Sequence, residues 1–185
     1  MNSNERLQST SLLVFTALLT AMTTLATMFF KFPIGNGYIH LGDAFILLSA
    51  MILPRKHAIF AGSVGACLAD ILSGYAVWAP WSFAIKLVVV LIMQGALHFA
   101  SKTTEDKMHI LNVPAMEFVG FIVSAVWTVL AYYVAEGLIY GNWITPLASA
   151  PFNAIQVGVG AALAVLLSQL LYRIAGNFHF SYRRK

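Results

Sequence analysis

Four ionisable side chains lie inside apolar stretches or at their ends, and they are Asp43, Asp70, Lys86 and Glu136. An ionisable group in hydrocarbon is costly, so it usually faces a cavity or another charge. Lys86 lies about one and a half turns into its stretch, too deep to reach water easily. It therefore needs a carboxylate or a ligand acceptor, and the three acidic residues are the candidates. Glu117 lies at the opposite end of its stretch, where a solvated helix terminus explains it.

Polar and aromatic residues accompany these charges at one end of the apolar stretches. They are His40, Tyr75, Trp78, Trp81, Trp143, Asn153 and Gln156. Aromatic rings suit stacking on a flat heterocycle, and the polar groups suit hydrogen bonds to ring nitrogens, amines and hydroxyls. Hydrogen bonds between helices or an interfacial aromatic belt explain any one of them. The whole set gathers at the same end of the apolar stretches, which is one leaflet of the bilayer if these stretches span a membrane. We therefore expect a cavity for a small ligand at that end.

Two polar stripes with a spacing of four support this interpretation. One contains Ser82, Lys86, Gln94 and His98, and the other contains Ser124, Thr128, Tyr132 and Glu136. Neighbours at this spacing share a helix face, although the direction drifts by about 40° per step.

The elements that position these residues are membrane spans. The chain is 59% hydrophobic and 10% charged, with a mean hydropathy of +0.79, whereas soluble domains carry roughly 25% charged residues. We predict an all-α membrane protein in which residues 1–185 form a single bundle of six transmembrane helices. The predicted spans are residues 11–30, 41–53, 57–73, 81–100, 114–140 and 151–174.

The basic residues predict the orientation of this bundle. Arg55 and Lys56 join the second and third spans, and Lys102 and Lys107 join the fourth and fifth. Basic loops stay in the cytoplasm, so we expect both termini on the cytoplasmic side. The net charge of +4 is then loop charge and indicates no nucleic-acid partner. Cys67 is the single cysteine, so it forms no intrachain disulfide.

The second predicted span is too short to cross a bilayer. Residues 41–53 make about 20 Å of helix, against about 30 Å of hydrocarbon. We expect it to begin partway down, at the floor of an outward-facing cavity, with Asp43 capping its N-terminus. The preceding loop "FPIGNGYIH" would cover the cavity as a lid of irregular backbone. Gly35, Asn36 and Gly37 would give it the freedom to fold inward.

Three motifs carry a resemblance to a known family: "GYIHLGDAFI" at 37–46, "ADILSGYAVWAPWSFAIK" at 69–86 and "NAIQVGVGAALA" at 153–164. The chain resembles the substrate-binding S components of energy-coupling factor (ECF) vitamin transporters. It is most similar to the branch for riboflavin, hydroxymethylpyrimidine or pyridoxine. The resemblance implies a multi-pass protein of the bacterial cell membrane that captures a vitamin from outside. It would deliver the vitamin inward with a transmembrane coupling protein (T component) and two cytoplasmic ATPases.

The resemblance also implies a docking surface on the first span. The family carries Ala-x-x-x-Ala there, and "ALLTA" supplies Ala17 and Ala21. Small residues let another helix approach closely. By size, hydroxymethylpyrimidine and pyridoxine fit the expected cavity, whereas riboflavin needs more apolar ring area.

Two other classes of protein remain open. A stand-alone proton-coupled carrier would use Glu136 or Asp70 as a relay, although no internal repeat is visible. A membrane enzyme would use Asp43, Asp70 and His40 as acid–base or metal groups, but no H-E-x-x-H or similar motif occurs. The chain has no P-loop, so ATP would be used by the partner ATPases. We therefore expect no catalytic residue, no metal site and no cofactor bound by this chain.

Overall fold

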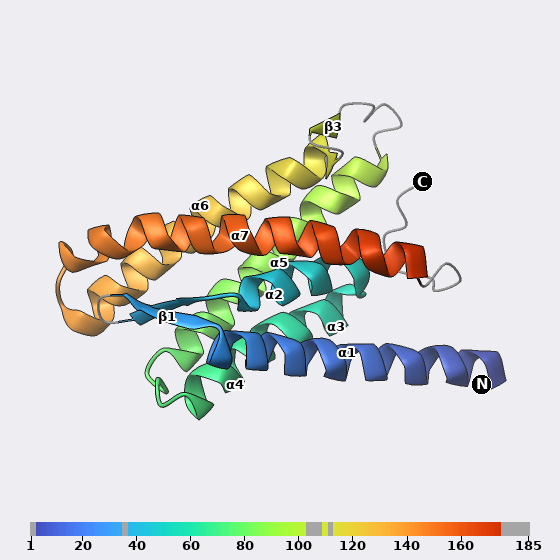
Figure 1. The fold of residues 1–185 in the computed structure, drawn as a ribbon, viewed down its shortest axis with the longest axis horizontal. Helices are drawn as coiled ribbons and strands as arrows, with labels where there is room; N and C mark the ends of the chain where they lie inside the picture. The colour runs from blue at the N-terminus through green and yellow to red at the C-terminus, as the bar shows by residue number, and fades with distance from the viewer. Residues whose placement is uncertain (1–2, 35–36, 103–108, 111–112, 175–185) are drawn as a thin grey trace.

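The computed structural model describes residues 3–34, 37–102, 109–110 and 113–174, and most of them are helical (Figure 1). In chain order the elements are α1 (Ser3–Phe29), β1 (Lys31–Ile34), β2 (Gly37–His40), α2 (Gly42–Ile52), α3 (Arg55–Ile59), the π-helical η1 (Phe60–Val64), α4 (Gly65–Leu72), α5 (Ala79–Lys102), β3 (His109–Ile110), β4 (Val113–Pro114), α6 (Ala115–Tyr140) and α7 (Thr145–Ile174). The elements α3, η1 and α4 follow one another without a break, so residues 55–72 form one helical segment.

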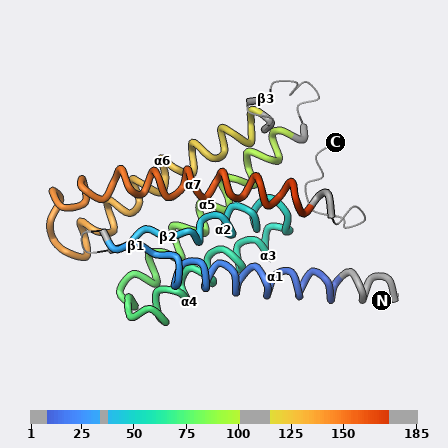
Figure 2. Tube along the Cα trace, viewed as in Figure 1, coloured from blue at the N-terminus to red at the C-terminus, as the bar shows by residue number. Residues whose placement is uncertain are grey.

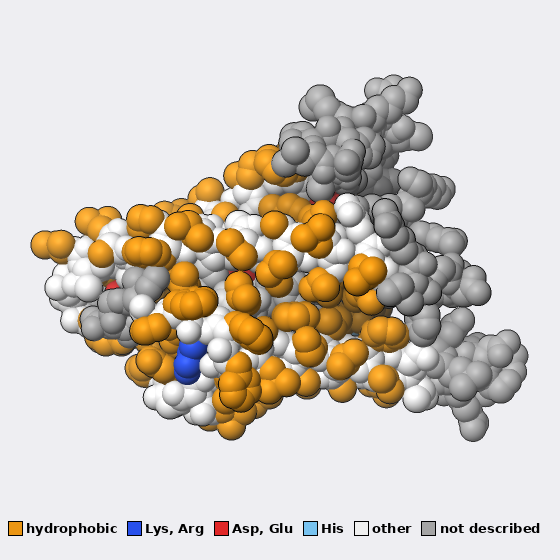
Figure 3. Space-filling view, in the orientation of Figure 1, with side chains coloured by type: hydrophobic (Ala, Val, Ile, Leu, Met, Phe, Trp, Pro, Cys, Tyr) orange, Lys and Arg blue, Asp and Glu red, His pale blue; other side chains and the backbone are white. Residues whose placement is uncertain are grey.

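Within the described residues, four helices are long and apolar enough to cross a membrane. They cover Ser9–Phe29, Ala79–Ala100, Ala115–Tyr140 and Thr145–Leu171. The all-helical membrane architecture agrees with the sequence, while the count of six spans and the cytoplasmic termini stay predictions. Large apolar side chains cover the face in Figure 3, as expected of a surface that contacts lipid.

The last helix begins earlier than predicted. The sixth predicted span starts at Pro151. The helix instead begins at Thr145 and contains Pro151. Asn142 explains the start, because its Oδ1 accepts hydrogen bonds from the backbone N–H groups of Ile144 (2.8 Å) and Thr145 (3.3 Å).

Helix α2 is short because other helices enclose it. It packs against α1, α5 and α7, and it passes between α1 and α7 (Figures 1 and 2). Ten of its 11 residues are buried, and 11 residues span about 16 Å. Apart from Asp43 and Ser49 the helix is apolar on all sides, which is typical of a central position where every side faces protein.

Two glycines allow this close packing. A Cβ on Gly160 of α7 would lie 2.9 Å from the Cβ of Asp43 in α2. A Cβ on Gly65 of α4 would lie 2.8 Å from the Cβ of Thr23 in α1. Neither position has room for a side chain unless the neighbouring helix moves.

The predicted irregular lid is a β-hairpin. Strands β1 and β2 pair antiparallel, with Lys31 opposite His40 and Ile34 opposite Gly37. Gly35 and Asn36, which join the strands, lie outside the described residues, and Gly37 begins β2. A Gly-Asn pair between two strand-like runs is itself a hairpin signal, and this signal was missed. The backbone groups are therefore paired rather than free, which suits a segment at membrane depth.

Candidate functional site

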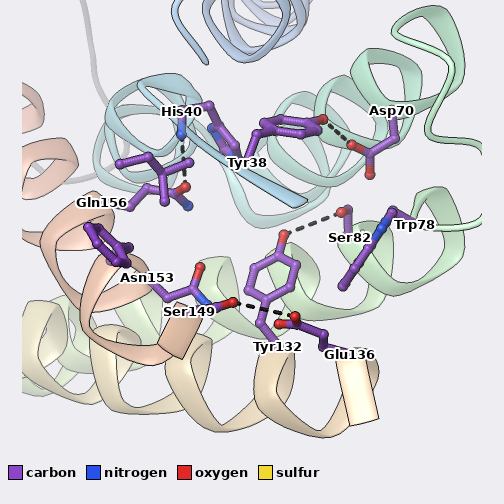
Figure 4. A pocket seen from close by; sticks show the side chains of 12 residues that line it. Tyr38, His40, Asp70, Trp78, Ser82, Tyr132, Glu136, Ser149, Asn153 and Gln156 are labelled. Atoms are coloured by element: carbon purple, nitrogen blue, oxygen red, sulfur yellow. Dashed lines mark hydrogen bonds between the residues drawn. The ribbon is translucent and has the colours of Figure 1, made fainter. Parts of the chain in front are cut away.

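A pocket opens at the end of the bundle that carries the hairpin (Figure 4). Strand β2, α4, the start of α5, the last turns of α6 and the first turns of α7 all contribute to it. Its volume is about 570 Å³, including the space at its opening. The lining residues are Tyr38, Ile39, His40, Asp70, Trp78, Ser82, Tyr132, Glu136, Ser149, Phe152, Asn153 and Gln156.

On one wall, the hairpin is fastened to α4. The Tyr38 hydroxyl donates a hydrogen bond to Oδ1 of Asp70. The Tyr38 ring meets the Tyr75 ring edge-on at 4.9 Å, and the Lys31 ammonium lies 5.2 Å and 5.4 Å from the centres of these two rings. Burial, together with the nearby Asp70 carboxylate, raises the pKa of the Tyr38 hydroxyl, which keeps it a donor.

The second oxygen of the Asp70 carboxylate, Oδ2, has no hydrogen bond like the one that Oδ1 accepts from Tyr38. This oxygen is buried and has no hydrogen bond within the part of the chain that the structure describes. A buried acceptor without a donor costs free energy, so a polar atom at this position of the pocket would be stabilised. The Ser82 hydroxyl interacts only weakly with this carboxylate, so Asp70 offers the pocket an acceptor that the fold satisfies incompletely.

The opposite wall combines a carboxylate with aromatic rings. Glu136 of α6 accepts a long hydrogen bond of 3.4 Å from the Ser149 hydroxyl. The hydroxyls of Tyr132 and Ser82 are 3.2 Å apart, and the rings of Trp78 and Tyr132 lie 6.0 Å apart. These rings provide apolar faces beside polar groups, which is a typical composition for a small-molecule pocket.

Below the pocket, a buried ion pair joins two helices. The Lys86 ammonium lies 2.7 Å from Oδ1 of Asp43, and the exposed fractions of the two side chains are 0% and 2%. The Gln156 amide donates to Oδ2 of Asp43 at 2.7 Å, and its carbonyl accepts from the His40 backbone N–H at 2.9 Å. The ring of Tyr132 lies over the ammonium at 5.1 Å. Helices α2, α5 and α7 and the hairpin are therefore linked at one point.

The predicted capping role of Asp43 is wrong. Leu41 occupies the N-cap position of α2, and no side-chain hydrogen bond caps this end. Asp43 lies in the first turn, where a negative charge still suits the helix dipole. One of its carboxylate oxygens pairs with the Lys86 ammonium and the other accepts from the Gln156 amide. A buried ammonium without a counter-charge costs more free energy than an uncapped backbone N–H, so the ion pair forms in place of the cap.

His40 is held as a neutral ring. Its Nδ1 accepts a hydrogen bond of 3.0 Å from the backbone N–H of Gly42. Burial lowers its pKa to about 4, with Lys86 acting in the same direction and Asp43 opposing it. An imidazolium could not accept this bond, so folding favours the uncharged form.

The structure brings five of the predicted site residues to the pocket wall, namely His40, Trp78, Glu136, Asn153 and Gln156. Asp43 and Lys86 lie beneath the wall, and Tyr75 packs against Tyr38 beside it. Trp81 and Trp143 are not among the lining residues. Ser82 lies on the face of α5 that is directed to the pocket, whereas Trp81 lies on a different face. The Trp81 ring packs against the cluster of Trp78, Ile85 and Ala135. The Trp143 ring lies against Gly137, where a Cβ would come within 2.5 Å of it.

Seven lining residues were missed as site residues: Tyr38, Ile39, Asp70, Ser82, Tyr132, Ser149 and Phe152. The spacing of four in α5 and α6 already contained Ser82 and Tyr132. Asp70 was considered as a partner for Lys86, a proton relay or an acid–base group, but it was not among the predicted ligand contacts. Nothing in the sequence distinguishes Ile39 or Phe152 from the many other apolar residues.

Ala17 and Ala21 lie on the exposed face of α1. The opposite face buries five threonines, Thr16, Thr20, Thr23, Thr24 and Thr27. One of them, Thr24, donates a hydrogen bond of 3.0 Å to the backbone carbonyl of Gly65. The predicted docking strip is thus accessible from outside the bundle, and its docking role stays a prediction.

A bundle of apolar helices with a polar, aromatic-lined pocket at one end is typical of a membrane transport protein. Residues 7–173 match the family of the ECF-type riboflavin transporter, S component, and the chain belongs to this family. The proteins of this family are transporters.

Two relatives are similar to the chain. The thiamine precursor transporter HmpT of Lactococcus lactis subsp. cremoris (strain MG1363) is 27% identical over 164 residues, which cover 87% of each chain. An uncharacterized protein in the gap 3′ region of Pyrococcus woesei is 32% identical over 120 residues, or 64% of this chain and 73% of that protein.

Proposed function

We propose that this chain is the vitamin-capturing S component of an ECF importer. It binds a small aromatic vitamin or vitamin precursor and delivers it inward with a T component and two cytoplasmic ATPases, which use the ATP. The observation that carries this proposal is the pocket between the hairpin and α4 to α7, in a chain of this transporter family. Its mixture of aromatic rings and polar groups suits a small heterocycle with polar substituents.

Hydroxymethylpyrimidine is our first candidate for the ligand, pyridoxine the second and riboflavin the third. The similarity to a thiamine precursor transporter supports the first candidate, and the family description keeps riboflavin among the candidates. The aromatic walls from Trp78 and Tyr132 face polar groups on Asp70, Glu136 and Asn153, which suits one ring with several polar substituents. Riboflavin would need a wider apolar surface for its three fused rings.

We assign different roles to the residues around the pocket. Trp78, Glu136 and Asn153 contact the ligand directly. Asp43, Lys86 and Gln156 hold the floor and the hairpin in place through the ion pair and the two hydrogen bonds of Gln156. His40 and Tyr75 position the hairpin, which acts as the lid.

We further propose that the pocket faces the outside of a bacterial cell membrane, with six spans and both termini in the cytoplasm. The start of α1 and the end of α7 lie at the end of the bundle away from the hairpin (Figure 1). The basic residues of the connecting segments support this orientation.

Reconstitution in proteoliposomes tests the proposal. The purified chain should bind the vitamin but accumulate none, whereas proteoliposomes that also contain the T component and ATPases should accumulate it when ATP is supplied. Mass spectrometry of small molecules released from the protein in mild detergent identifies the ligand. ATP-independent accumulation by the chain alone under a proton gradient would contradict the proposal and favour a stand-alone proton-coupled carrier.

A further inference from the structure

The pocket contains acidic side chains but no basic side chain to balance an anion. Asp70 reaches it from α4 and Glu136 from α6. None of its lining residues, all of them in the described part of the chain, is a lysine or an arginine. The histidine in the wall, His40, has a lowered pKa of about 4 and is therefore neutral near pH 7.

The two lysines near the pocket are both engaged elsewhere. Lys86 is fully buried, lies 2.7 Å from Asp43 and is covered by the Tyr132 ring. Lys31 lies over the rings of Tyr38 and Tyr75, outside the set of lining residues. Moving Lys86 to an anionic ligand would leave Asp43 buried without its counter-charge, and this is strongly unfavourable.

The acidic groups also have unused acceptor capacity. Oδ2 of Asp70 is buried and makes no hydrogen bond of good geometry in the described residues, with only a weak interaction of the carboxylate with the Ser82 hydroxyl. Glu136 accepts one hydrogen bond from the Ser149 hydroxyl, and its length of 3.4 Å makes it a weak bond for a hydroxyl donor. A ligand with N–H or O–H groups toward α4 and α6 would satisfy both carboxyl groups, and a ligand that carries only acceptors would satisfy neither.

We propose that this pocket selects uncharged or cationic ligands that carry hydrogen-bond donors, and that it rejects their phosphate esters and carboxylate derivatives. This inference rests on the proposed function and names the chemical class of its substrate. Like charges placed opposite each other, together with the desolvation of an unpaired anion, disfavour the ester. A phosphate ester in the surroundings must therefore be hydrolysed before uptake.

Titration calorimetry with matched pairs of ligands tests this selectivity. The pairs are hydroxymethylpyrimidine, pyridoxine and riboflavin, each compared with its own phosphate monoester. Every parent compound that binds should bind at least about 100-fold more tightly than its ester, which corresponds to about 2.7 kcal/mol. An ester that binds as tightly as its parent would overturn the charge selectivity while leaving the proposed function intact. Failure of all six compounds to bind would overturn both the inference and the proposed ligands.

A pair of lysine substitutions separates charge from shape. Asn153→Lys places a cation in the pocket wall, whereas Ala148→Lys adds the same charge at an exposed position of α7 that does not line the pocket. We expect Asn153→Lys to reduce the preference for the parent compound at least tenfold and Ala148→Lys to leave it within about twofold. The ratio of ester to parent dissociation constants could also be equal in both variants and the wild type, with all three proteins monodisperse. That result would show that electrostatics does not set the selectivity.

Discussion

Replacing Lys86 by methionine should destabilise the protein strongly while removing little volume. Lys86 and Asp43 lie 2.7 Å apart, with exposed fractions of 0% and 2%, so the substitution leaves a buried carboxylate without its counter-charge. Breaking such a pair costs about 3 to 5 kcal/mol. The Gln156 amide still donates to Oδ2 of Asp43, which favours the lower end of this range. In a chain of 185 residues, this cost lowers Tm by roughly 6 to 20 °C.

Thermal unfolding in mild detergent, followed by tryptophan fluorescence, measures the effect. Lys56→Met is the matched control, because Lys56 is exposed at the start of α3 and its loss should change the stability by less than about 0.5 kcal/mol. The double variant Asp43→Asn/Lys86→Met removes both charges and keeps an oxygen that can accept from Gln156. It should recover at least half of the lost Tm.

Two results would refute this reasoning. A Tm of Lys86→Met within about 2 °C of the wild type would mean that the ion pair contributes little to stability. If that variant also lost ligand affinity, Lys86 would be a ligand contact and not a structural partner of Asp43. A double variant no more stable than the single one would mean that the cost arises from packing and not from the unpaired charge.

Three further predictions concern binding, docking and pH. Glu136→Gln and Asn153→Ala should each weaken ligand binding in calorimetry, by about 10- to 150-fold if a charge-assisted hydrogen bond is lost, with little change in Tm; unchanged affinity in both would move the site elsewhere. The double variant Ala17→Trp/Ala21→Trp should abolish co-purification with the T component and keep the ligand affinity, because the bulky rings prevent close helix approach; continued co-purification would contradict the docking role. Since the pKa of His40 falls to about 4 in the folded state, its contribution to stability is complete above about pH 6.5 and is lost as the pH decreases toward 4. Tm measured between pH 7.5 and 4.5 should therefore fall more in the wild type than in His40→Asn, and an equal fall would contradict the assignment.

The long helices were predictable because hydrophobicity alone defines them. Windows of 18 residues with high mean hydropathy and few charges have few alternatives to a membrane-length helix. The start of α7 was not predictable in this way, because hydrophobicity does not show that Asn142, nine residues before Pro151, accepts hydrogen bonds from the N–H groups where the helix begins. The segment predicted to be an irregular lid forms a β-hairpin, because its two strands pair antiparallel, and its role as a lid stays a prediction.

The site was predictable as a region but not as a set of contacts. Ionisable and polar residues at one end of the predicted spans indicated where the pocket would lie. Three carboxylates were equally plausible partners for Lys86, and only the packing of α2 against α5 places Asp43 beside it. The direction of each side chain around its helix decides the rest, because Trp81 and Ser82 are adjacent in sequence and only Ser82 lines the pocket.

The ion pair also sets an order of events during biosynthesis. Asp43 leaves the ribosome 43 residues before Lys86, which at about 5 to 20 residues per second is a delay of about 2 to 9 s. During this interval α2 carries an unpaired carboxylate, at a cost of about 2.5 to 3.5 kcal/mol if it enters the bilayer. At 11 residues it is also too short to insert as a span of its own. Nascent chains that end before Lys86 should therefore keep α2 at the membrane surface and be preferred substrates of membrane proteases, whereas chains that extend through α5 should be protected.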